Sequence, residues 1–243
     1  MMDVGNRDLI TKTEEYVKGV FENREGKLLI AHGFSNVDRV RKWSLRIAEG
    51  ESFNDLLIVG LAALLHDIGL PRIKNESERS KHGQLGAEIA EEYLTKNSSL
   101  SKEQVEQITL AIRVHTQEPT LRMRNIEAVK ANGKLAEILC DADIMDGIGA
   151  VGLMRAFTSK YSLPEYESGN VKGETWALSS EEFTVRIKNG PGIGKYIIDQ
   201  INFQISYREN LLTKTARSLA EPLIEFMEQF VIQLDSEVNH VQP

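Results

Sequence analysis

The segment Leu56–Leu65 is apolar at every position, and it leads directly into His66 and Asp67. A run with no polar face is typical of a helix that is buried on all sides. A histidine and a carboxylate at the end of such a helix each cost several kcal/mol if they are left without partners. Because neighbouring side chains leave a helix about 100° apart, we do not expect these two simply to pair with each other. Hydrogen bonds, a salt-bridge network or a bound cation must therefore offset the cost of burying these two polar side chains.

Four more polar residues fall on apolar faces of predicted helices. A capping box at Ser35 and Asp38 indicates a helix that runs to Gly50. The spacing of apolar residues places Asn36 on the inward face of that helix and His82 at the start of an inward stripe after residue 80. His115 shares the apolar face of a helix that Ser101 caps, and Asp143 is in line with apolar residues of a helix over 135–157. Each residue alone is more often a hydrogen-bonded core residue than a ligand. As a set with His66 and Asp67, they match the side chains that hold divalent metal ions near neutral pH.

The rest of the chain is predicted to be helical, with three irregular parts. Residues 72–80 and 122–130 are interpreted as polar connections, and residues 162–189 as a long loop or small subdomain in which helical periodicity fades. The glycine-rich residues 189–195 do not form a phosphate loop, because the spacing is one residue short and Tyr196 replaces Ser or Thr. We predict an all-α chain with a core over 1–160, a loop or lid segment over 161–195, and C-terminal helices over 196–243 that pack on the core.

The amino-acid composition limits the kinds of partner that the protein can bind. A net charge of -7 argues against binding to nucleic acid or to an anionic membrane surface. The single cysteine, Cys140, cannot form an internal disulfide and is interpreted as a small core residue. No run reaches the length of a membrane span, so we expect a cytoplasmic protein. An apolar stripe from Leu219 to Phe230 packs on the core or on a second subunit, which leaves a homodimer open.

Four segments resemble the HD-domain superfamily of metal-dependent phosphohydrolases, in that family's order. They are AHGFSNVDRV, AALLHDIG, KHGQLGAEIAEE and DADIMDGIGAVGLMRAF, which together span Ala31 to Phe157. The resemblance implies a helical bundle with extra C-terminal helices. These last helices resemble those of the bacterial nucleotide pyrophosphohydrolase subgroup.

The resemblance also implies roles for the inward polar residues. His66 and Asp67 match the HD pair, with Asp67 as the metal-bridging and catalytic carboxylate, and Asp143 matches the final ligand. His82 and His115 match the histidines that members with two ions use for the second ion. Asn36 stands where the family has a histidine, so it would be a weak ligand that shifts preference from Zn or Ni toward Mg or Mn. One or two divalent ions (Mn, Mg, Fe, Ni or Zn) are expected.

A metal held in this way activates water and polarises a phosphoryl oxygen, so the expected reaction is phosphate hydrolysis. The expected substrate is a small phosphorylated molecule, a nucleotide above all, bound by cationic or histidine side chains. The candidates are Arg39, Lys81, Arg113, Arg155 and His32. A 5′-nucleotidase or phosphodiesterase is an alternative of the same class. A different alternative is a degenerate HD protein, in which Asn36 has weakened the metal site and the fold serves as a ligand-sensing or interaction module.

Overall fold

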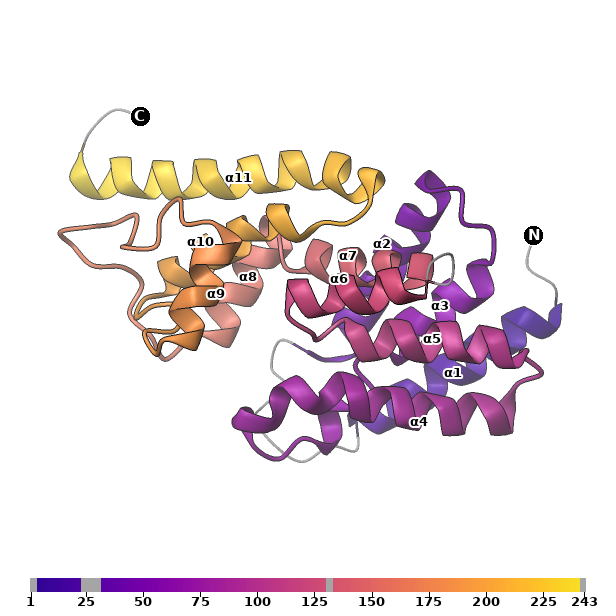
Figure 1. Cartoon of the computed structure of the whole chain (residues 1–243). Coiled ribbons are helices and arrows are strands. Elements are labelled where there is room, and N and C mark those ends of the chain that lie inside the picture. Colours follow the sequence, from indigo (N-terminus) through magenta and orange to yellow (C-terminus); the bar gives the residue numbers. More distant parts are fainter. Residues whose placement is uncertain (1–3, 23–31, 130–132, 241–243) are drawn as a thin grey trace. The chain divides into compact units, whose positions relative to one another are not determined.

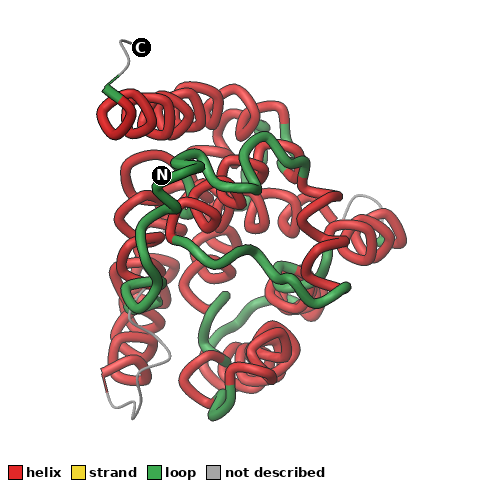
Figure 2. Tube along the Cα trace, turned by 90° about the vertical axis from the view of Figure 1, so that its left-hand side faces the viewer, coloured by secondary structure: helices red, strands yellow, loops and turns green. Residues whose placement is uncertain are grey.

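The computed structural model describes residues 4–22, 32–129 and 133–240. These residues form α-helices joined by turns and loops and contain no β-strand, apart from one isolated bridge between Glu167 and Asn170 (Figures 1 and 2). The prediction of an all-α chain is therefore confirmed. The chain divides into two compact units, Met1–Asp143 and Ile144–Pro243.

The first unit contains the buried apolar helix and the helices around it. Its elements are α1 (Val4–Glu22), α2 (Phe34–Gly50), α3 (Leu56–Leu65), the 3₁₀ turns Leu70–Arg72 and Glu76–Lys81, α4 (His82–Asn97), α5 (Lys102–Val114), α6 (Pro119–Ala128) and most of α7 (Lys134–Asp146). The buried helix over the apolar run Leu56–Leu65, the helix that begins near His82 and the cap at Ser101 are confirmed. The structure adds Gln104 as the partner of Ser101 in a capping box.

Helix α3 is the centre of this unit. It packs against α1, α2 and α5, and α4 packs in turn on α5. Leu61, Leu64 and Leu65 have no exposed surface, and the burial of each such side chain stabilises the fold by about 1.5–3 kcal/mol. At the N-terminus of α3, Asp55 accepts a hydrogen bond from the Ile58 backbone N–H. The end of α3 is therefore held in a rigid apolar setting.

The expected capping box on α2 is wrong. Gly33 is the N-cap residue and no side chain caps the helix. The Asp38 carboxylate instead makes ion pairs with Arg41 at 2.9 Å and Lys42 at 2.6 Å. These local ion pairs at i+3 and i+4 compete with the backbone for the carboxylate. The helix nevertheless ends at Gly50 as predicted.

Two more predictions of secondary structure, both between residues 119 and 159, are wrong. Residues 122–130 are not only a polar connection, because α6 runs through them as far as Ala128. The single helix expected over 135–157 is two helices, α7 and α8 (Gly149–Ser159). The break follows from Gly149, whose φ of +69° belongs to the left-handed region that interrupts a right-handed helix.

The second unit is also helical. Besides α8 it contains α9 (Ser180–Lys188), α10 (Ile197–Ile205), a 3₁₀ turn at Ser206–Asn210, and α11 (Lys214–Asn239), with α8 packed on α10 and α11. Helix α9 lies inside the segment expected to be irregular. The chain turns between α10 and α11, so the C-terminal part is more than one helix, as the sequence predicted.

The glycine-rich segment before α10 has a packing role. Gly194 has a φ of +148°, and a Cβ there would lie 2.3 Å from the Asp199 carboxylate. That carboxylate accepts hydrogen bonds from the backbone N–H groups of Lys195 and Tyr196 and from the Thr175 hydroxyl. The segment therefore anchors the start of α10. None of the described helices is both long and apolar enough to cross a bilayer.

Candidate metal centre

His66 and Asp67 follow directly on the last residue of α3. Both are buried, with 0% and 3% of their surfaces exposed. Contrary to the sequence-based expectation, the two side chains do meet, because His66 Nε2 lies 3.4 Å from Asp67 Oδ2. The helical rule for neighbours does not hold here, since α3 ends at Leu65 and the following four residues form a turn.

The Asp67 carboxylate is surrounded by imidazoles. Its Oδ2 atom lies 3.3 Å from His32 Nδ1 and 3.4 Å from His66 Nε2. Its Oδ1 atom lies 3.1 Å from His82 Nε2 and 3.5 Å from His115 Nε2. These residues come from the chain before α2, the end of α3, the start of α4 and the end of α5. Tertiary packing thus brings four histidines onto one acid, and we call this group with Asp143 the Asp67 cluster.

Three of the histidines are oriented by the same kind of hydrogen bond. In each, Nδ1 donates a hydrogen bond to the backbone carbonyl three residues earlier. The pairs are His66 with Ala63 at 2.8 Å, His82 with Arg79 at 2.5 Å and His115 with Ile112 at 2.6 Å. This bond places a proton on Nδ1 and leaves Nε2 to face the carboxylate, which is the arrangement of metal-binding histidines.

The donor atoms fit a cation. The Nε2 atoms of His66 and His115 are buried and have no hydrogen-bond partner, although such atoms are normally satisfied. One ligand atom each of Asp67, His82 and His115 lies within 4.8 Å of the others. Imidazole and carboxylate donors at this spacing suit a divalent transition metal ion.

The charged groups of the cluster shift one another's pKa values. Burial alone would lower the pKa of His66, but the adjacent Asp67 carboxylate outweighs it and raises that pKa to about 9. Burial would raise the pKa of Asp67, but the surrounding histidines hold it well below its ordinary value. Burial lowers the pKa of His115. The metal-free cluster therefore holds a carboxylate together with a proton on His66.

The remaining predicted ligands are Asp143 and Asn36. Asp143 Oδ1 lies 4.0 Å from His66 Nε2, so α7 brings a second carboxylate to the cluster. Its side chain is 35% exposed and that of His32 is 23% exposed, which makes this the open side of the cluster. Asn36 is buried on α2, with 1% of its surface exposed.

The candidate substrate-binding cations have different surroundings. Arg39 and Arg113 are half-buried, on the helices that carry Asn36 and His115 respectively. Lys81 is exposed and makes a 3.0 Å ion pair with a glutamate three residues earlier. Arg155 lies in the second unit, where it pairs with the buried carboxylate of Asp146. The structure thus joins His32 to the cluster, while Lys81 and Arg155 have carboxylate partners of their own.

Sequence reasoning missed one cationic residue and one glycine. Arg122 was assigned to a polar connection, but it lies on α6 and is only 6% exposed. Arg122 shares the buried face of α6 with Ile126, four residues later, but the polar sequence around it gives no sign of this burial. Gly69 has a packing role that the sequence pattern does not reveal. A Cβ there would lie 2.3 Å from the His82 backbone oxygen, so glycine lets the turn after Asp67 approach α4.

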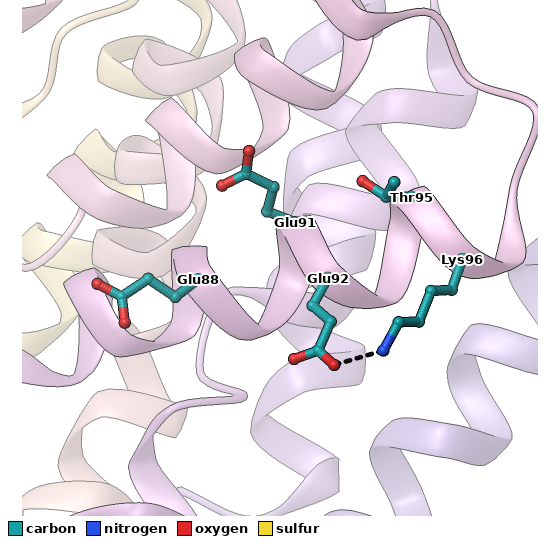
Figure 3. Close-up of a pocket in the computed structure, with 5 residues that line it drawn as sticks. All are labelled: Glu88, Glu91, Glu92, Thr95 and Lys96. Carbon is teal, nitrogen blue, oxygen red and sulfur yellow. Dashed lines mark hydrogen bonds and ion pairs between the residues drawn. The ribbon is translucent and has the colours of Figure 1, made fainter.

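A surface hollow of about 330 Å³ lies elsewhere in the first unit, on α4 (Figure 3). Its lining residues are Glu88, Glu91, Glu92, Thr95 and Lys96. Glu92 and Lys96 pair with each other at 2.6 Å. None of these residues belongs to the Asp67 cluster, so the hollow is not part of the candidate centre.

An all-α fold whose buried helix is followed by a His-Asp pair, with further histidines gathered on the acid, defines a helical domain with a candidate metal site. Residues 34–148 match the HD domain family. The protein therefore carries an HD domain, with additional helices on its C-terminal side.

Solved structures show the same fold over nearly the whole chain. One is an HD-superfamily hydrolase from Bacillus thuringiensis, at 20% identity and a TM-score of 0.63, covering 96% of this chain and 98% of that one. Another is a predicted HD superfamily hydrolase from an uncultured Thermotogales bacterium, at 25% identity and a TM-score of 0.58, covering 93% and 91%. Bacillus subtilis YpgQ in complex with ADP matches at 21% identity and a TM-score of 0.58, covering 96% and 97%. No curated protein sequence matches the chain.

Proposed function

We propose that the protein is a divalent-metal-dependent phosphohydrolase that acts on a nucleotide or a related phosphate ester. The observation that carries this proposal is the Asp67 cluster, in which four imidazoles meet one buried carboxylate. A bound cation, coordinated by the nitrogen atoms that face Asp67, would account for a buried carboxylate in this position. The HD domain match supports the same reading.

In this proposal His66, Asp67 and Asp143 hold one ion, with His82 and His115 available for a second. The Nδ1 hydrogen bonds of the three histidines keep each ring turned toward the ion, which reduces the entropy lost on binding. His32 contacts Asp67 from the open side.

A divalent ion supplies two effects at such a site, since it lowers the pKa of a bound water molecule and polarises a phosphoryl oxygen. The chain's own residues supply position and charge. Asp67 orients the nucleophilic water. Its pKa lies well below the ordinary value, so the carboxylate stays ionised and can accept a hydrogen bond from that water. The buried walls formed by α3 and α5 exclude bulk water on one side, while Asp143 and His32 border the side that substrate approaches.

Nucleotides are the preferred substrate class within this proposal. YpgQ, which has the same fold, was crystallised in complex with ADP, so a relative accommodates a nucleoside diphosphate. Hydrolysis of a nucleotide phosphoanhydride is our first choice, and the 5′-nucleotidase and phosphodiesterase reactions use the same machinery. These reactions differ in product, which makes a product assay the way to separate them.

A second candidate is a metal-poor HD module that senses a ligand or binds a partner. The observation that favours it is the buried Asn36 at the position of a family histidine. An amide oxygen binds transition metals more weakly than imidazole does. The two candidates make different predictions for metal content and for turnover.

The test is elemental analysis of protein purified without chelator, before and after addition of Mn²⁺, for the unchanged chain and for Asp67→Asn. Asp38→Asn is the matched control, because Asp38 pairs with Arg41 and Lys42 on α2. Nucleoside mono-, di- and triphosphates are then assayed for released phosphate and pyrophosphate.

We expect one or two equivalents of metal in the unchanged chain and in Asp38→Asn, and loss of both metal and turnover in Asp67→Asn. Full hydrolytic activity in Asp67→Asn would contradict the mechanism. Absence of metal from the unchanged chain, even with Mn²⁺ supplied, would establish the second candidate instead.

A further inference from the structure

Arg122 is a buried cation beside the candidate metal centre. It lies on α6, the helix that follows and packs on α5, which ends at Val114 directly before His115 (Figure 1). Only 6% of its surface is exposed, and it shares the inward face of α6 with Ile126. The next arginine on the same helix, Arg124, is exposed. The burial is thus specific to position 122.

The guanidinium of Arg122 has no carboxylate partner among the described residues. Its Nε atom is fully buried and makes no hydrogen bond. Two other arginines that are largely withdrawn from solvent are paired, Arg41 with Asp38 and Arg155 with Asp146. An unpaired buried charge is costly to a fold. An anionic group that binds next to Arg122 would remove this cost.

The position of Arg122 links it to the Asp67 cluster. Its guanidinium lies beside the thiol of Cys140 on α7. Asp143 is three residues further along the same helix, which puts the two on one face about 5–6 Å apart. Asp143 in turn lies 4.0 Å from His66 Nε2. The unpaired cation therefore stands within about one helical turn of the open side of the cluster.

Cys140 does not neutralise this cation. Burial raises the pKa of the Cys140 thiol to about 11, even though Arg122 acts in the opposite direction. The thiol is therefore uncharged at neutral pH. The guanidinium therefore has a hydrogen bond with a neutral thiol, which carries no charge to balance it.

We propose that Arg122 is an anion-binding residue of the Asp67 cluster, which takes a phosphate oxygen of the substrate through its guanidinium. This inference rests on the proposed function and names one residue that recognises the phosphate. A guanidinium presents a planar fork of donors that fits two phosphate oxygens. It does so here at a buried site, where a charged hydrogen bond is stronger than in water.

The test uses pyrophosphate as the probe, with binding measured by calorimetry on the Mn²⁺-loaded protein and on the metal-free protein. The variants are Arg122→Met, which keeps the length of the side chain without its charge, and Arg122→Lys, which keeps the charge without the fork. Arg124→Met is the matched control from the exposed side of α6. Metal content and melting temperature are recorded for all four proteins.

We expect Arg122→Met to bind pyrophosphate roughly ten- to hundredfold more weakly than the unchanged chain, as the loss of charged hydrogen bonds predicts. Arg122→Lys falls between the two, and Arg124→Met is unchanged. Metal content stays the same in all of them. Because Met leaves no charge to bury, the melting temperature of Arg122→Met in the absence of pyrophosphate should equal or exceed that of the unchanged chain.

Two results would overturn the inference. One is pyrophosphate binding that is equally tight in Arg122→Met and in the unchanged chain, or absent from the unchanged chain in both forms. The other is a large fall in melting temperature with no selective loss of pyrophosphate, which would make Arg122 a purely structural residue. If Mn²⁺ does not bind, the proposed function fails, while the metal-free measurement still decides the role of Arg122.

Discussion

The raised pKa of His66 predicts that metal binding to this protein displaces a proton. In the metal-free cluster the Asp67 carboxylate raises the pKa of His66 to about 9, against the opposing effect of burial. A metal ion takes a deprotonated imidazole. At neutral pH an incoming ion must therefore expel the proton from His66, and the apparent metal affinity must rise with pH.

The magnitude follows from the distance between the pKa and the pH. With a pKa of about 9, His66 is almost fully protonated at pH 7, which weakens metal binding by about a hundredfold relative to pH above 9. The penalty is about tenfold at pH 8. The stability of the metal-free protein should change in the opposite sense. A pKa raised above the unfolded value of about 6.5 stabilises the fold fully below pH 6.5, and this contribution disappears as pH rises through about 9.

The assay is calorimetric titration with Mn²⁺ at pH 7.0, 7.75 and 8.5, in buffer pairs of different ionisation enthalpy, which gives both the affinity and the number of protons released. We expect an affinity that rises about tenfold per pH unit and release of about one proton from His66 near pH 7.5. His66→Asn should flatten the pH dependence, whereas His240→Asn, on the exposed end of α11, should not change it. An affinity that varies less than threefold across this range, or the same proton release from His66→Asn, would refute the assignment.

Two further substitutions test the setting of the site. Gly69→Ala places a Cβ against the His82 backbone oxygen, so we expect about 1–3 kcal/mol of destabilisation and weaker metal binding. Denaturant unfolding and Mn²⁺ titration measure these two effects. The control is Gly19→Ala, which should not be destabilising because a Cβ there has nothing within 4 Å. Arg155→Met leaves the buried Asp146 carboxylate without this partner and should lower the free energy of unfolding by about 3–5 kcal/mol with metal content unchanged. A fall in kcat/KM without loss of stability would instead make Arg155 a substrate-binding residue.

The parts of the structure that are visible in the sequence are those governed by local pattern. The uninterrupted apolar run predicted the buried helix α3, and apolar spacing placed His82 and His115 on inward faces. These inferences hold because burial and helix periodicity act within one segment. The inward direction of His66 and Asp67 followed from the same argument.

The parts that failed depend on contacts between distant segments or on single backbone angles. The pairing of His66 with Asp67 depends on the turn after Leu65, which periodicity does not describe. The break after α7 depends on the left-handed conformation of Gly149. Arg122 escaped notice because a polar residue among other polar residues gives no sign of burial until the helix packs. No local pattern in the sequence predicts that four imidazoles would surround the two oxygen atoms of one carboxylate.

The convergence of distant segments on Asp67 also has a consequence for folding. The only cysteine of the chain, Cys140, is free, so no disulfide can fasten one part of the sequence to another. An ion shared by the end of α3, the start of α4, the end of α5 and α7 would act as a reversible cross-link, because it closes several long loops at one point. It would do so only after those helices had assembled. Uptake of the ion would then mark the completion of folding, and a chelator would loosen the first unit as a reducing agent loosens a disulfide-bonded domain.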